Sequence, residues 1–137
     1  RSHQLNWGEP HDPIDTCHYY WPIIHSPGDL HLSQGYGQGI LVVEGDLELT
    51  GDFEFVGLIF VFGALRSSGQ GNKIVGSTNV LGQSALETEL DASGAGSTNL
   101  QLSSCAIERA HIYSSRLARP IPLAERSFVD ISALGVE

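Results

Sequence analysis

Histidines are the side chains of this 137-residue sequence best suited to metal binding or proton transfer. There are six, and five lie within the first 31 positions: His3, His11, His18, His25, His31 and His111. A zinc site usually takes two ligands from one element at a tight spacing such as His-x3-His or Cys-x2-Cys. No pair of these histidines has that spacing, although Asp12 and Asp15 lie among them. We therefore expect surface histidines, no bound metal and no cofactor.

Four carboxylates are the nearest candidates for an enzyme that cleaves glycans, because that reaction uses two carboxyl groups at a set separation. They are Asp46, Glu48, Asp52 and Glu54. All four fall on outward positions of the repeat described below, which favours a solvated charged face. Serines are abundant, but no G-x-S-x-G turn marks one as a nucleophile. We therefore expect no catalytic residue and a non-enzymatic protein.

Two cysteines, Cys17 and Cys105, flank the glycine-rich part of the chain. A disulfide between them would suit an exported protein, whereas two unrelated buried thiols would suit a cytosolic one. We prefer the disulfide. In the fold expected below, the two cysteines start at opposite ends of a stack about 20 Å tall. A bridge therefore requires residues 1–20 to run along the stack to Cys105; otherwise the helix lies elsewhere or the bridge is absent.

Charge and hydropathy exclude several classes of partner. The formal charge is -9, with 16 acidic against 7 basic residues. Nucleic-acid binding needs clustered Lys and Arg, so we expect no nucleic-acid partner. No apolar run approaches the roughly 20 residues that cross a bilayer, so we expect no membrane-spanning segment in this chain. The absence of methionine predicts a mature or excised fragment of a longer precursor.

Glycines recur at every sixth position in the middle of the chain: Gly39, Gly45, Gly51, Gly57, Gly63 and Gly69. Apolar and polar residues alternate between them, as at Leu47 and Leu49, with the two-residue period of a β-strand. Short strands with a corner every six residues close a triangle in about 18 residues, as in hexapeptide β-helices.

Repetition at longer range supports this coil length. Residues 39–44 align with 57–62, then with 76–81, and finally with 96–102. The sequence therefore predicts an all-β fold with one helix, in which residues 21–102 form a short triangular parallel β-helix of four to five coils. The alternative is an antiparallel sandwich in which the glycine spacing has no structural meaning.

Residues 104–118 lack glycine and have apolar side chains at helical spacing, with Ala106, Ala110 and Tyr113 on one stripe. We expect a C-terminal α-helix here, as part of a helix-and-tail segment over residues 103–137. Residues 1–20 would form an N-terminal extension or cap. All three segments would belong to a single domain.

The first side of the expected coil has apolar residues at outward positions as well as inward ones: Ile40, Val42, Leu58, Phe60 and Phe62. Strands that are apolar on both faces are expected where both faces are covered. We prefer cover by the C-terminal helix, which would pack on this side. The alternative is a partner-binding or self-assembly patch.

An aromatic cluster at residues 18–21, together with Trp7, could stack on a sugar or plug the open end of the first coil. We prefer the plug. The residues that we select as a candidate partner or ligand surface are Tyr19, Tyr20, Trp21, Leu58, Phe60 and Phe62.

Two segments resemble the C-terminal domain of PilX-like, type IV pilus assembly-associated proteins of bacteria. The first is the glycine- and aliphatic-rich run of residues 35–61, and the second is S-S-C-A-I-E-R-A at residues 103–110. The likeness covers about residues 17–130, and the first segment is also similar to the repeats of bactofilins, which form polymers. The PilX-like family provides no active-site residues to carry over.

The resemblance implies an exported bacterial domain, extracellular or at the cell surface, that follows a hydrophobic helix of the prepilin kind. We therefore expect a structural or adhesive role, with other pilus or surface proteins, or further copies of the chain, as partners. One alternative is a self-polymerising scaffold like the bactofilins. Another is a carbohydrate-binding or carbohydrate-active β-helix.

Overall fold

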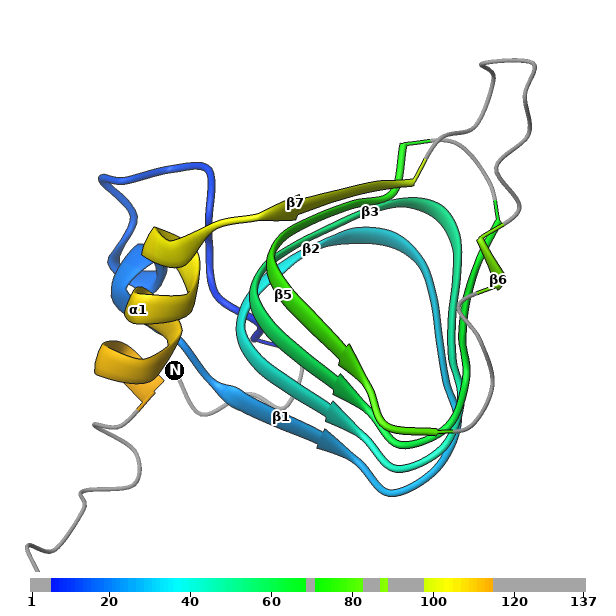
Figure 1. Ribbon diagram of the computed structural model, residues 1–137. Helices are drawn as coiled ribbons and strands as arrows, with labels where there is room; N and C mark the ends of the chain where they lie inside the picture. Colours follow the sequence, from blue (N-terminus) through cyan, green and yellow to red (C-terminus); the bar gives the residue numbers. More distant parts are fainter. Residues whose placement is uncertain (1–5, 69–70, 83–86, 89–97, 115–137) are drawn as a thin grey trace, which may run out of the picture.

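The computed structural model describes residues 6–68, 71–82, 87–88 and 98–114. It is a triangular parallel β-solenoid with about 18 residues per coil and one helix along its side, which confirms the expected fold (Figure 1). The described strands make about three turns, where four to five were expected. The elements are η1 (Thr16–Tyr19), β1 (Ile23–Ser26), β2 (Leu30–Val43), β3 (Leu47–Val61), β4 (Leu65–Ser67), β5 (Lys73–Val80), β6 (Glu87–Thr88), β7 (Asn99–Leu102) and α1 (Ser104–Ser114).

Successive coils pair in parallel and in register. β2 pairs with β3 so that Ile40 lies beside Leu58, 18 positions on, and β3 pairs with β5 so that Leu58 lies beside Ser77. Strands β2 and β3 run on around a corner instead of stopping at each glycine. We call the side that begins with residues 39–44 the first side of the triangle, and the side that contains residues 51–56 the third. Residues 96–102 were expected to align with residues 76–81 on the first side. This alignment is wrong, because Asn99 pairs with Lys73, and β7 therefore extends the third side.

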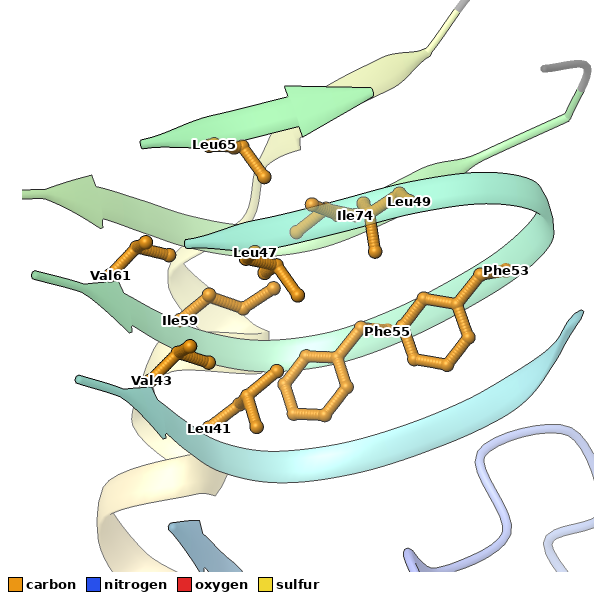
Figure 2. Close-up of a cluster of buried hydrophobic side chains, with 10 residues drawn as sticks. All are labelled: Leu41, Val43, Leu47, Leu49, Phe53, Phe55, Ile59, Val61, Leu65 and Ile74. Carbon is orange, nitrogen blue, oxygen red and sulfur yellow. The ribbon is translucent and has the colours of Figure 1, made fainter. Parts of the chain in front are cut away.

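The interior is filled by aliphatic and aromatic side chains that stack from coil to coil (Figure 2). Leu47 lies beside Leu65 in the pairing of β3 with β4, and both side chains are buried. Branched and aromatic residues suit such strands because they fill a pleated, buried surface well. Each fully buried Leu, Ile or Phe stabilises the fold by roughly 1.5–3 kcal/mol through removal of its apolar surface from water.

The corner that begins the first side depends on glycine. Gly57 has φ of 140°, a region that side chains larger than hydrogen rarely adopt. A Cβ at this position would collide with the carbonyl oxygen of Gly39 in the coil below. Glycine is therefore required here for two reasons, the backbone angle and the close approach of neighbouring coils.

A second corner is held by aspartates. The backbone N–H of Asp46 donates to Asp29 Oδ1 at 2.8 Å, and that of Ala64 donates to Asp46 Oδ1 at 2.8 Å. Each carboxylate thus binds the amide one coil further along the chain. These Gly-Asp corners satisfy backbone donors that would otherwise have no strand partner.

Helix α1 covers the first side of the solenoid, as predicted, and Figure 1 shows it beside β2, β3 and β5. Its first turn is capped by Ser103, whose Oγ accepts a hydrogen bond from Ala106 N at 3.3 Å. Ala106, Ala110 and Ser114 form its buried stripe. The expected end at residue 118 lies outside the described residues. Within the described ranges, no helix has the length and apolarity that crossing a bilayer requires.

Candidate functional site

The first coil has a gap in its interior on the third side. Gly35 and Gly37 take the inward positions there and pair with Phe53 and Phe55 of the coil above. In Figure 2 both rings extend from β3 toward the level of β2, where the two glycines provide no side chain. The core at this end therefore depends on groups brought in from elsewhere.

Trp7, from the N-terminal segment, fills half of this gap. Its ring packs edge-on against Phe53, with centroids 6.2 Å apart, and lies against the space that a Cβ on Gly37 would occupy. The segment is held to the coil edge by a hydrogen bond from Gln38 N to Trp7 O at 2.8 Å. Trp7 therefore occupies the plug position expected from the sequence.

Gln38 fixes the rest of the N-terminal segment to the coil. Its side chain is fully buried, and Nε2 lies 3.1, 2.8 and 2.9 Å from the carbonyl oxygens of Cys17, His18 and Tyr20. One amide thus binds the whole turn formed by η1. The Oε1 atom of Gln38 is buried without a partner among the described residues.

The other half of the gap, above Gly35, is an open cavity of about 370 Å³. A Cβ at Gly35 would meet no atom within 4 Å, so this glycine is what leaves the space free. Apolar side chains of Trp7, Leu32 and Phe53 form one wall. Polar groups line the other part, and they belong to Asn6, Gln34 and Tyr36.

The Tyr36 ring beside this cavity is held in place from two sides. Its hydroxyl donates to Glu9 Oε2 at 2.7 Å, and His11 packs edge-on against its ring with centroids 5.1 Å apart. The hydrogen bond to Tyr36 is the main reason that the pKa of Glu9 is lowered from 4.5. The same bond, with the Glu9 charge, raises the pKa of Tyr36 from 10.0.

The opposite end of the solenoid is built differently. Leu100 of β7 lies beside the buried Ile74 and so continues an interior stack, yet it is 42% exposed. Leu102, two positions further along β7, is 79% exposed. We call Leu100 and Leu102 the open end. A shallow cavity of about 220 Å³ lies between β5 and β7 here.

The six surface residues selected from the sequence are divided between two environments. Trp21 and Leu58 are buried with Ala110 in the contact between the solenoid and α1, and Phe60 packs against this cluster. Phe62 remains 51% exposed beyond the helix. Tyr19 is 61% exposed, Tyr20 is half-buried, and the Tyr19 ring lies 6.3 Å from that of Tyr113.

The expected disulfide is absent, because Cys17 and Cys105 are both free. The reason is the direction of α1. Its C-terminal end meets the N-terminal segment, where Ser114 Oγ donates to Trp21 O at 3.0 Å. Cys105, the second residue of the helix, lies nine residues before Ser114, about 13 Å away along the helix axis. A disulfide requires Cα atoms within about 7 Å.

The described histidines and carboxylates make small, separate groups of contacts with different partners. His25 Nε2 lies 2.8 Å from Glu44, and His31 Nε2 lies 2.7 Å from Thr50 Oγ1. Glu54 lies 3.1 Å from Lys73 and 3.5 Å from His11. The described part of the chain contains no group of three metal-ligating side chains. His3 lies outside it.

Sequence reasoning missed both the cavity and the open end. The signal for the cavity was present, since Gly35 and Gly37 stand where the next coil has Phe53 and Phe55. The open end was hidden by the incorrect alignment of residues 96–102. Comparison with models of known protein families, with curated proteins and with solved structures returns no match.

Proposed function

We propose that this chain is an exported, non-enzymatic structural module that attaches to a pilus or cell-surface protein through the open end of its solenoid. One observation carries this proposal: within the part of the chain that the structure describes, the interior stack ends on the exposed Leu100 and Leu102 of β7. Exposed apolar clusters on otherwise polar proteins mark interaction sites. The resemblance of residues 35–61 and 103–110 to PilX-like proteins supports the class of partner.

The covered first coil favours a partner protein over a polymer of this chain. A filament that grows by stacking coils needs both ends of each subunit free. Here the N-terminal segment binds the first coil through Gln38 and inserts Trp7 beneath Phe53. Head-to-tail stacking would have to displace these contacts, which makes the bactofilin-like scaffold the weaker alternative.

The export part of the proposal depends on the resemblance alone. A disulfide would have supported an oxidising compartment, and the free state of Cys17 and Cys105 removes that support. Protease treatment of intact source cells, with detection by antibody, tests it directly. We expect digestion in intact cells; protection until lysis would contradict export.

The open end is tested by a photo-crosslinking amino acid placed at Leu102 in the source cells. We expect adducts with pilus or surface proteins, identified by mass spectrometry. The matched control is the same group at Ile14, an exposed apolar residue of the N-terminal segment. Equal adducts at both positions, or adducts with cytosolic proteins only, would overturn the proposal. Filaments of the purified chain in negative-stain microscopy would instead support the scaffold.

A further inference from the structure

We infer that the cavity above Gly35 is a binding site for an uncharged oligosaccharide, at the end of the solenoid opposite to the open end. The inference does not depend on the proposed function. The cavity volume of about 370 Å³ falls within the usual range of small-molecule sites. The walls determine the class of ligand, and they consist of aromatic rings, aliphatic groups and amides.

The apolar wall suits the face of a sugar ring. Trp7 and Phe53 are fixed against each other by their edge-on contact at 6.2 Å, so the wall exists before any ligand binds. Tyr36 is 48% exposed and presents a second ring. Aromatic rings bind the C–H face of a sugar through burial of apolar area, and a rigid ring loses little entropy on binding.

The polar lining suits hydroxyl groups that carry no charge. Asn6 and Gln34 contribute amides, and an amide can both donate and accept hydrogen bonds. The Asn6 amide already binds Gly8 N and Cys17 Sγ, which leaves Gln34 as the adaptable group. None of the described residues that line the cavity is charged, and Glu9 lies next to Tyr36. An anionic ligand would therefore lie close to the Glu9 carboxylate, with no described Lys or Arg in the lining.

The Tyr36 side chain is held in one position by contacts with the N-terminal segment, which the pairing of β2 does not itself require. It lies at an outward position of β2, yet Glu9 and His11 of the N-terminal segment hold its hydroxyl and its ring. An exposed tyrosine usually samples several rotamers, and fixing it beforehand lowers the entropy lost on binding. Glu9 and His11 are therefore positioning residues, and Tyr36 contacts the ligand.

The test is an NMR titration of the ¹⁵N-labelled chain with cellotetraose and, separately, with tetra-N-acetylchitotetraose. We expect saturable shifts at the Trp7 indole and at the amides of Gly35 and Tyr36 with at least one of them. The Trp21 indole, which is 3% exposed beneath α1, is the internal reference and should not move. Because this mapping uses the unaltered chain, it does not depend on any variant folding.

Variants separate stacking from other effects. Tyr36→Ala should weaken binding about tenfold, because it removes the ring. Tyr36→Phe keeps the ring and should retain binding, while Tyr19→Ala removes a still more exposed tyrosine elsewhere and should have no effect. The absence of shifts at Trp7 up to the solubility limit of both sugars would overturn the inference. Saturable binding of indole without binding of either sugar would overturn the assigned ligand class.

Discussion

The two ends of the solenoid differ in how the stack of inward side chains terminates. At the first coil, glycines leave the interior short of side chains, and Trp7 is brought in to cover Phe53 and Phe55. At the last coil, Leu100 adds a side chain to the stack, but it remains exposed. A solenoid can thus end either by omitting its last inward side chains or by leaving them exposed. The first arrangement leaves a cavity, and the second leaves an exposed apolar surface.

The largest difference between the ends should appear in stability. Phe55→Ala removes a fully buried ring beneath which Gly37 has no side chain, so we expect a loss of about 3–5 kcal/mol in the free energy of unfolding. Leu100→Ala, at the exposed top of the same stack, should cost less than about 1 kcal/mol. Urea denaturation followed by circular dichroism measures both. Equal losses would mean that the last coil is covered in solution.

A smaller effect is expected from detaching the N-terminal segment. Gln38→Leu leaves the carbonyls of Cys17, His18 and Tyr20 without their shared donor, and we expect a cost of about 1–3 kcal/mol. Hydrogen exchange should also become faster at the η1 amides. Gln34→Leu alters an exposed glutamine on the same strand and is the matched control. Unchanged exchange in η1 would show that other contacts hold the segment.

The smallest effect concerns pH. The lowered pKa of Glu9 makes its bond to Tyr36 contribute above pH 4.5, and this contribution is lost as the pH falls through the folded-state value. The raised pKa of Tyr36 makes its own contribution complete below pH 10.0, and that is lost as the pH rises through the higher folded-state value. We expect the NMR titration midpoint of Tyr36 to fall in Glu9→Gln. An unchanged or higher midpoint would contradict the bond.

Local periodicity was enough to predict the coil, because one face of each strand is mostly apolar and the corners repeat. The column of Leu47 and Leu65, and the cover of Leu58 by α1, follow from that pattern. The position of β7 could not be predicted, because repeated letters such as G-S-T-N do not reveal how many residues a corner absorbs. The direction of α1 was equally hidden, and it determined the state of both cysteines.

The candidate cavity could be predicted only in part. Glycines at positions 35 and 37 break the inward apolar pattern, and a missing side chain in a repeat indicates a gap. What fills the gap depends on Trp7, which is 28 positions from Gly35 and belongs to a segment with no repeat of its own. The burial of Gln38 could not be predicted either, because nothing in the sequence distinguishes a single buried polar residue at an outward position from an exposed one.

The aspartates at the second corner fix the number of residues in each coil that they join. Where Asp29 and Asp46 tie one turn to the next, pairing partners are 17 or 18 positions apart, as for Leu30 with Leu47 and Leu47 with Leu65. At the following corner the tie is missing, since Ala64 takes the aspartate position, and Arg66 pairs with Glu87, 21 positions on. A foreign peptide inserted after Gly82, at the corner that lacks this tie, should therefore be accommodated, whereas one inserted between the two aspartates would push every later side chain out of its column.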